Sequence, residues 1–260
     1  NSYQSSLGGM ILGGDYTVTG KDNAKWRSGA AVSVGTGDVK SRGDFNKTKN
    51  DVDFWGIRLY SGWTKDNLSV IGSLGYSRSK NDITQELPSS MQMGSLSADT
   101  HASAWDVGVK GEYRFETPNV DVIPYAGVHY THLKTNGFDV TNAGQTVFNM
   151  ESDTQNIWSF PLGVAFEKNL KSQNGWMVKP KASVGIIAAA GDLKARSVAR
   201  IPGLDAASSL STEVVDSITF AGGLGISASK GNATFGLTYG IQASENRTGQ
   251  AAAVSFRYKF

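Results

Sequence analysis

The three histidines of this 260-residue sequence are the side chains best suited to proton transfer near neutral pH. His101 follows Asp99 by two residues, but no second acid or nucleophile lies beside this pair in the sequence. His129 and His132 lack the HExxH spacing of a zinc site. We therefore interpret Asp99 and His101 as a contact at the end of a loop, and we expect structural or loop roles for all three histidines.

Other features that could serve chemistry are equally weak. The glycine-rich stretch GGLGIS at 222–227 lacks the lysine of a phosphate-binding loop and has the pattern of a strand. The sequence contains 25 Lys and Arg, 23 Asp and Glu, and no Cys. A net charge of +2 does not indicate a nucleic-acid partner. We expect no catalytic residue, no metal site and no cofactor.

In the segments that carry these residues, large apolar side chains alternate with small or polar ones. In residues 157–167 the side chains at 158, 160, 162, 164 and 166 are large and apolar, whereas serine, glycine, alanine and glutamate stand between them. The same split recurs in 104–115, 120–130 and 176–186, among others. Alternation with a period of two predicts strands with one apolar and one polar face.

These strands are about 10 to 14 residues long, and about 9 to 11 residues suffice for a tilted strand to cross a bilayer. Strands of soluble proteins average about 5 to 6 residues, so a soluble β-sandwich is the weaker alternative. The mean hydropathy is −0.27. A membrane barrel accommodates this low value because only every second residue of each strand meets lipid. Aromatic residues at strand ends, such as Trp55 and Trp63, are typical of membrane interfaces.

The connections between strands alternate in length. The short ones are 20–24, 64–67, 116–119, 171–175 and 229–232, and the long ones are 36–51, 80–100, 135–153 and 189–212, with 244–249 as a short exception. Outer-membrane barrels have short periplasmic turns and longer extracellular loops. We therefore expect the long connections to face outward from the cell.

The pattern predicts an all-β fold, a transmembrane antiparallel up-and-down β-barrel that forms one domain over residues 1–260. About eleven strands are visible, whereas single-chain bacterial barrels have an even number. We expect twelve strands in the complete barrel, the missing one preceding Asn1. The start NSYQSSLGG lacks the features of a signal peptide, which indicates a mature chain or a piece of a longer one.

Charged residues on the polar faces are expected to line the barrel lumen. An Arg or Lys that faced the lipid at mid-bilayer would cost about 2 to 4 kcal/mol, whereas a wet lumen hydrates or pairs it. Two interpretations remain open: a lining that lets an extended polypeptide pass, or a salt-bridge network that stiffens the barrel. The expected lumen-lining residues are Arg58, Asp106, Lys110, Glu112, Arg114, Asp121, His129, Glu167, Lys179, Lys181, Arg257 and Lys259.

The final segment AAAVSFRYKF places Val254, Phe256, Tyr258 and Phe260 on one face. This row resembles the assembly signal that the barrel-assembly machinery recognises in outer-membrane proteins. With the basic inward face, the expected twelve strands, the stretch GGMILGGDY at 8–16 and the RSGAAVSVGTGDV that follows it, the chain resembles the C-terminal translocator domain of an autotransporter.

The resemblance implies a bacterial outer-membrane barrel, without enzymatic activity, that anchors and exports an N-terminal passenger polypeptide. Its implied partners are outer-membrane lipid, the passenger, a linker helix in the lumen and the barrel-assembly machinery; passenger and linker lie outside this sequence. Some members release the passenger at paired asparagines, but Asn1 stands alone, so that cleavage is not expected here. The alternatives are a porin-like channel, or an outer-membrane enzyme or adhesin that acts through its extracellular loops.

Overall fold

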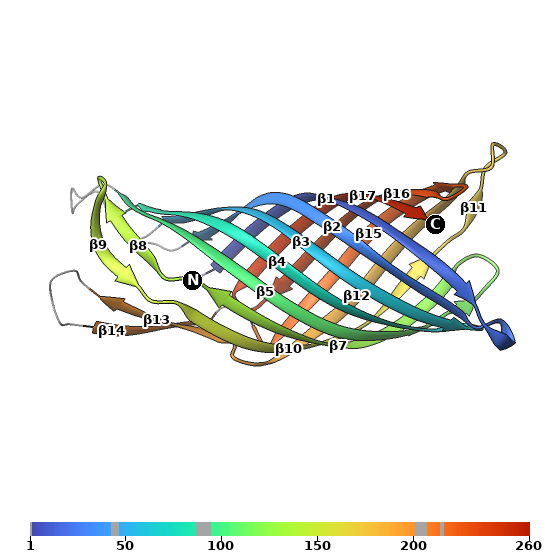
Figure 1. Cartoon of the computed structure of the whole chain (residues 1–260), viewed down its shortest axis with the longest axis horizontal. Helices are drawn as coiled ribbons and strands as arrows, with labels where there is room; N and C mark the ends of the chain where they lie inside the picture. Colours follow the sequence, from blue (N-terminus) through green and yellow to red (C-terminus); the bar gives the residue numbers. More distant parts are fainter. Residues whose placement is uncertain (1, 43–46, 87–94, 201–206, 214–215) are drawn as a thin grey trace.

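The computed structural model describes residues 2–42, 47–86, 95–200, 207–213 and 216–260, and these form one β-barrel (Figure 1). Eleven long strands of the described residues make up its wall. They are β1 (Ser2–Thr19), β2 (Lys25–Arg42), β3 (Lys47–Lys65), β4 (Leu68–Glu86), β5 (Ser95–Tyr113), β7 (Asp121–Thr135), β10 (Asp153–Glu167), β12 (Met177–Gly191), β15 (Ile218–Lys230), β16 (Ala233–Ser244) and β17 (Arg247–Lys259).

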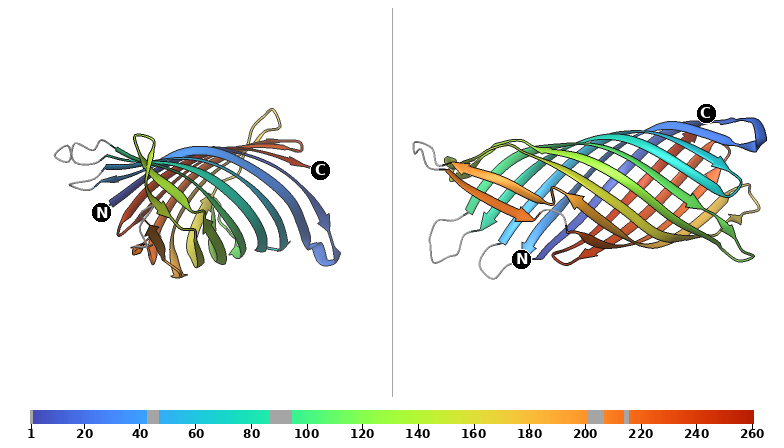
Figure 2. Two further views of the ribbon diagram at one scale, coloured as in Figure 1. Left: turned by 60° about the vertical axis from the view of Figure 1, so that its left-hand side comes forward. Right: turned by 90° about the horizontal axis from the view of Figure 1, so that it is seen from below.

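Shorter elements lie at the two ends of the barrel. They are the 3-10 turn η1 (Lys21–Asn23) and the strands β6 (Phe115–Glu116), β8 (Phe138–Asn142), β9 (Gln145–Met150), β11 (Leu170–Lys171), β13 (Lys194–Arg200) and β14 (Ala207–Glu213). The hairpins β8–β9 and β13–β14 project from the same end, which we call the outer end (Figures 1 and 2). The inner end carries the short turns, and this asymmetry agrees with the predicted alternation of loop lengths.

Most of the large apolar side chains point away from the lumen. Phe220, Leu224 and Leu237 are each more than half exposed, as are many other apolar residues of the wall. A wall of this kind is stable only where the surroundings are apolar, because water would solvate the exposed surface poorly. The predicted all-β transmembrane barrel is therefore confirmed as the fold. Separately, no helix among the described residues is long and apolar enough to cross a membrane.

The strands are longer than the sequence predicts. Strands β3 and β4 pair continuously from Lys65 and Leu68 to Lys47 and Glu86. The predicted long connections 36–51 and 80–100 were therefore wrong in their bounds, since most of their residues continue the strands. Only 43–46 and 87–94 remain between strands there, and they lie outside the described residues. Backbone hydrogen bonding carries strand pairing past the membrane even where the apolar alternation has ended.

The barrel closes through a parallel pairing of β1 with β17, while the other neighbouring strands pair antiparallel. An odd number of strands that run alternately up and down forces one such parallel pair, which we call the seam. On the outside of the seam, Tyr239 donates to Gln250 at 2.8 Å and Gln250 donates to Ser6 at 2.9 Å. The expected twelfth strand stays a prediction; it would fit antiparallel to both strands of the seam.

Two aromatic rows mark the edges of the apolar band. Toward the outer end, Tyr76 lies between Trp55 and Trp105, with ring centroids 5.7 and 4.6 Å apart. Toward the inner end, Tyr113 contacts Phe115 at 4.7 Å. Such girdles lie at membrane interfaces, because the rings tolerate both lipid and headgroups. The two rows therefore set the level of the membrane along the barrel.

The short turn between β16 and β17 is held by a buried carboxylate. Asp216 accepts hydrogen bonds from the Ser244 hydroxyl, from the Asn246 amide nitrogen at 3.1 Å and from Asn246 Nδ2 at 2.9 Å. The hydrogen bond from Ser244, followed by those from Asn246, outweighs burial and holds the pKa of Asp216 below its ordinary value of 3.8. Asp216 therefore fastens this outer turn to the segment that enters β15.

Acid is expected to loosen this turn. The pKa of Asp216 is lower in the folded state than in the unfolded chain. The stabilisation of the turn by Asp216 is therefore complete above pH 3.8, and it is lost as the pH falls through the pKa of the folded state. The amide protection factor of Asn246, corrected for intrinsic exchange, should fall in that range. Asp216→Ala should lower the protection of the Asn246 amide already at neutral pH. The expected decrease in the free energy of local opening is about 1 to 3 kcal/mol. Unchanged protection in the variant would contradict this role.

Candidate functional site

The lumen has two unlike walls. The long polar side chains that face the lumen come mainly from β3, β5 and β7, with Glu167 at the end of β10, and they lie beside the small inward residues of β4. We call this side the polar wall. Inward positions of β12, β15, β16, β17 and β1 carry mostly small residues, and we call this side the small-residue wall. The latter includes Ser183, Gly185, Gly223, Gly225, Thr238, Gly240, Ala251 and Ala253.

A bidentate ion pair crosses the polar wall. Arg58 on β3 donates from Nη1 and Nη2 to the two carboxylate oxygens of Asp106 on β5, at 2.7 and 2.8 Å, and from Nη1 to the Ser73 hydroxyl at 3.0 Å. The pair spans the intervening strand β4 at Gly75. A Cβ at Gly75 would lie 2.6 Å from Asp106 Oδ2 and 2.7 Å from Arg58 Nη2. The missing side chain therefore lets the pair lie flat against the wall.

Gly75→Ala is expected to push this pair apart. The added methyl group would overpack the site, and we expect the free energy of unfolding to fall by about 1 to 3 kcal/mol. Gly72→Ala is the matched control, because its Cβ would meet only the Gly108 carbonyl oxygen, at 3.8 Å. Denaturant unfolding of the folded barrel measures both variants. An equal loss in the two would show that the ion pair is not the cause.

A second charged cluster lies at the inner end of the polar wall. Arg114 Nη1 is 2.8 Å from Asp121 Oδ2 and 3.1 Å from Glu167 Oε1. Lys110 lies 3.9 Å from Glu112 and 5.2 Å from the centre of the Tyr125 ring. Acidic partners thus neutralise much of the positive charge on this wall and hold the long side chains against it.

A third polar group joins β1, β3 and β17 across the seam. The Tyr60 hydroxyl donates to Asp15 Oδ2 at 2.9 Å, and Arg257 Nε lies 3.3 Å from the same oxygen. The Asp15 side chain is fully buried, whereas that of Arg257 is 40% exposed. Among the described residues Arg257 Nε has no aligned hydrogen-bond partner, so its attraction to Asp15 Oδ2 is electrostatic. Asp15 Oδ1 likewise has no hydrogen-bond partner there.

Sequence reasoning missed Asp15 and Tyr60. A signal was present, because Asp15 stands between Gly14 and Tyr16 on the polar face of the segment 8–16. Its importance could not be read from one strand, since its two partners come from strands far apart in the chain.

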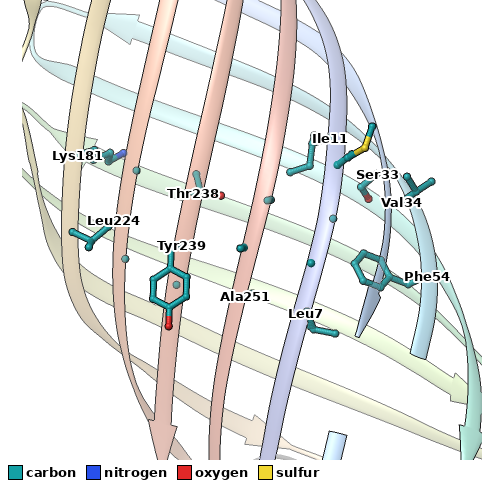
Figure 3. A pocket seen from close by; sticks show the side chains of 18 of the residues that line it. Leu7, Ile11, Ser33, Val34, Phe54, Lys181, Leu224, Thr238, Tyr239 and Ala251 are labelled. Atoms are coloured by element: carbon teal, nitrogen blue, oxygen red, sulfur yellow. The ribbon is translucent and has the colours of Figure 1, made fainter. Parts of the chain in front are cut away.

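The small-residue wall borders the open part of the lumen. Figure 3 shows β12, β15, β16, β17, β1 and β2 side by side around a cavity of about 530 Å³. A second cavity of about 950 Å³ lies along the same strands and reaches Gln4 and Asp38. Lys181 and Thr238 are among the few polar side chains at the first cavity (Figure 3). This wall therefore leaves room for another polypeptide segment.

The inner mouth of the lumen is mainly basic. A cavity of about 540 Å³ there is lined by Lys25, Arg27, Lys110, Arg114, Lys181 and Lys259, with Asp66, Glu112 and Glu116 as the acidic members. Lysines on flexible stems present hydrated charge that does not bind an extended chain firmly. The mouth is consequently polar over most of its lining, with Val70 and Ile71 among its few apolar residues.

The structure places the expected lumen-lining residues on inward positions of their strands or at the inner end. It brings together Arg58 with Asp106, Arg114 with Asp121 and Glu167, and Lys110 with Glu112. His129 lies over Gly108, between Asp106 and Lys110 on β5, and no ion pair of His129 is found among the described residues. Lys179 and Lys181 belong to β12, and Arg257 and Lys259 to β17, so these four stand on the other side of the lumen.

The expected assembly-signal residues form the outward row of β17. Val254, Tyr258 and Phe260 are 52%, 40% and 81% exposed, and the Phe256 ring lies 5.1 Å from that of Phe235. A Cβ at Gly14 on β1 would lie 2.8 Å from the Phe260 ring, so Phe260 packs across the seam. The row is accessible from the membrane and also helps to close the barrel.

Asp99 and His101 lie on the outward face of β5 near the outer end. Across the strand pair, Asp82 is in register with Asp99, and Lys80 with His101. Asp82 is thus the second acid that the sequence did not reveal, because it lies on β4. Within the described part of the chain, no group of three or more His, Asp or Glu is arranged to hold a metal ion.

The family model described as "Autotransporter beta-domain" matches residues 1–240. The chain belongs to the autotransporter β-domain family. Translocator domains of this family are outer-membrane β-barrels of Gram-negative bacteria that are attached to an exported passenger. This assignment confirms the family that the sequence resembles, and it explains a barrel with a mainly apolar outer surface and an open lumen.

Solved translocator domains share the fold at low sequence identity. The β-domain of the Bordetella autotransporter BrkA superposes with a TM-score of 0.59 at 17% identity, over 93% of this chain and 83% of that one. The translocator domain of NalP from Neisseria meningitidis gives 0.54 at 17% identity, over 93% and 81%. At this identity the likeness shows the fold alone.

Curated sequence relatives are similar over part of the translocator domain. The Escherichia coli K12 protein named putative uncharacterized protein YaiT is 29% identical over 143 residues, which cover 54% of this chain and 14% of that protein. YaiT of Salmonella typhimurium is 27% identical over the same length. The match therefore spans about 14% of the length of these relatives.

Proposed function

We propose that this translocator domain is embedded in the bacterial outer membrane and exports a passenger joined to its N-terminal side. The passenger's connecting segment would run through the lumen along the small-residue wall. The observation that carries the proposal is the cavity of about 530 Å³ beside this wall, opposite the tightly paired charges of the polar wall. The role is physical, and we infer no catalytic chemistry for the barrel itself.

The polar wall and the small-residue wall are suited to different roles. Small side chains on β15, β16 and β17 keep space open, and their backbones can be approached closely by a second segment. The paired charges on the polar wall already satisfy one another, so they offer few free groups to a passing chain. The polar wall therefore stiffens the barrel while the small-residue wall receives the segment, which joins the two interpretations that the sequence left open.

Cysteine crosslinking can locate the segment, because the chain has no native cysteine. The full protein would carry Thr238→Cys together with one cysteine in the segment that precedes Asn1. Thr238 faces the cavity, whereas its neighbour Leu237 is 55% exposed on the lipid side and provides the control Leu237→Cys. A disulfide with Cys at 238 but not at 237 supports the proposal. A disulfide with neither, in folded barrels, would contradict it.

Filling the small-residue wall is expected to block export. A Cβ at Gly225 would lie 3.6 Å from its nearest neighbour and one at Gly240 would lie 3.7 Å away, so both positions accept a side chain. Gly225→Trp with Gly240→Trp should leave the barrel folded but reduce surface display of the passenger, measured by protease accessibility on whole cells. Gly111→Trp, at an open position on the outward face of β5, is the control. Full display in the double variant would refute this path.

A porin-like channel is the second candidate, favoured by the same cavities. Steady ion conductance of the purified barrel in a planar bilayer, unchanged when the upstream segment is present, would support it.

We further propose that the outward row of β17 is recognised by the barrel-assembly machinery. Replacing Phe260 with Ala should then slow insertion more than it lowers the stability of barrels that have already folded.

A further inference from the structure

We propose that the outward surface of β4, β5 and β7 binds the phosphate-bearing headgroup of an anionic lipid in the outer leaflet. The inference rests on the membrane placement in the proposed function, but it does not depend on export. The site consists of a basic cluster, formed by Arg78, Lys80, His101 and Lys134, immediately beyond the outer aromatic row. All four side chains are exposed.

Strand register brings the cluster together from three strands. Arg78 on β4 is paired with Ser103 on β5, and Ser103 is paired with Lys134 on β7. Arg78 and Lys134 therefore lie two strands apart, roughly 10 Å between backbones, with a small hydroxyl side chain between them. One further step along the strands, Lys80 is paired with His101. Two flexible cations on either side of a serine can converge on one phosphate group.

The acidic residues nearby lie on the side of the cluster that faces away from the membrane. Asp82 and Asp99 form the next outward pair beyond Lys80 and His101. Asp53, in register with Lys80, accepts a hydrogen bond from Thr36 at 2.9 Å. No ion pair joins Arg78 or Lys134 to a carboxylate in the described ranges of the chain. An anion is thus attracted to the membrane side of the cluster, at the level of Arg78 and Lys134.

The membrane side of the cluster fits the apolar part of such a lipid. Directly below it, the Tyr76 and Trp105 rings are 4.6 Å apart. Below these rings an outward hollow of about 260 Å³ is lined by Val107, Val109, Val128, Tyr130 and Trp158. Cations, aromatic rings and an apolar hollow follow one another toward the membrane centre, in the order in which an amphiphile presents its headgroup and acyl chains.

The hollow is built on a fixed polar support. The Asn156 side-chain oxygen accepts from the Tyr130 hydroxyl at 2.6 Å and lies 2.8 Å from His132 Nδ1. The Tyr130 and Trp158 rings are 5.0 Å apart, so the hydrogen bonds hold this part of the lining in place. His132 is also in register with Trp105, directly below the basic cluster.

The outward positions near the seam lack charge toward the outer end. Ala243, Thr248, Gln250 and Ser6 occupy these positions on β16, β17 and β1. On β2 and β3 the outward Lys40 and Lys49 each lie 3.5 Å from an aspartate. Unlike Lys40 and Lys49, Arg78 and Lys134 have no carboxylate partner among the described residues, which favours this cluster as the site for a phosphate-bearing headgroup.

The test measures lipid binding by the purified full chain in detergent micelles, using native mass spectrometry and diphosphoryl lipid A as the probe. Arg78→Gln with Lys134→Gln should weaken binding roughly tenfold or more, because two charge-assisted contacts are lost. Lys40→Gln with Lys49→Gln removes the same net charge from exposed positions elsewhere and should leave binding unchanged. The charge-retaining variant Arg78→Lys with Lys134→Arg should keep most of the affinity.

Several outcomes would overturn the proposal. Equal weakening in both glutamine variants would show attraction by net charge alone. If dephosphorylated lipid A binds as tightly as diphosphoryl lipid A, the site does not recognise phosphate. If inorganic phosphate binds as tightly as diphosphoryl lipid A, the ligand is free phosphate and not a lipid. If Arg78→Gln with Lys134→Gln fails to fold, the test uses Arg78→Lys with Lys134→Arg after its folding has been checked. Loss of lipid binding in that folded variant would also refute the site. None of these results bears on passenger export, which is measured separately.

Discussion

Replacing Asp15 with alanine should lower the free energy of unfolding by about 3 kcal/mol, the low end of the cost of breaking a buried ion pair. The substitution removes the acceptor of the Tyr60 hydroxyl and leaves Arg257 without its anion beside the seam. The cost is kept at the low end because the Arg257 side chain is 40% exposed and partly hydrated. Denaturant unfolding of the barrel in lipid vesicles measures the loss.

A double-mutant cycle separates the ion pair from simple loss of packing. Arg257→Ala should cost less in the Asp15→Ala background than in the native chain, because its partner is already absent. Tyr60→Phe serves as the control for the hydrogen bond alone and should cost only about 1 kcal/mol. Additive losses for Asp15 and Arg257 would show that the two charges do not stabilise the seam together.

Replacing Leu237 with arginine should cost about 2 to 4 kcal/mol, because its side chain is 55% exposed on the lipid side of β16. The neighbouring substitution Thr238→Arg introduces the same side chain on the opposite face, beside the cavity. There the guanidinium group stays hydrated, so the expected cost is below about 1 kcal/mol. The comparison keeps the strand, the introduced residue and nearly the depth constant while it changes the face.

Reversible unfolding in vesicles measures both variants, and heat-dependent migration on gels checks that each is folded. The alternation of large apolar residues places Leu237 on the lipid side of β16, and Thr238 lines the cavity on the opposite face. A larger loss at 238 than at 237 would reverse that assignment for the strand. Similar losses at both positions would show that the cavity is too dry or too narrow to solvate an arginine.

The wall of the barrel could be predicted from local pattern. Apolar residues at 158, 160 and 162 required an outward face, and this also placed Glu167 on the opposite face of β10. The lengths of the outer elements were less accessible. Residues 138–150 form the hairpin β8–β9 within a predicted loop, because strand pairing at the outer end has no apolar alternation to announce it.

The lumen could be predicted as a set of residues but not as an arrangement. Arg58 and Asp106 were both assigned inward, yet their pairing depends on the register of β3, β4 and β5 and on the bare backbone of Gly75. The split into a polar wall and a small-residue wall likewise appears only when β12 to β17 and β1 lie side by side.

By itself the sequence determined which face of each strand meets lipid, because side chains alternate with a period of two and a charge in lipid is costly. It therefore also determined the barrel class, the inward residues and the unequal ends. Only the tertiary structure decided which inward residues meet, where the barrel closes and where cations gather outside. Those properties depend on register between strands, which places Asp15 beside Arg257 and Arg78 near Lys134 although they are distant in the chain.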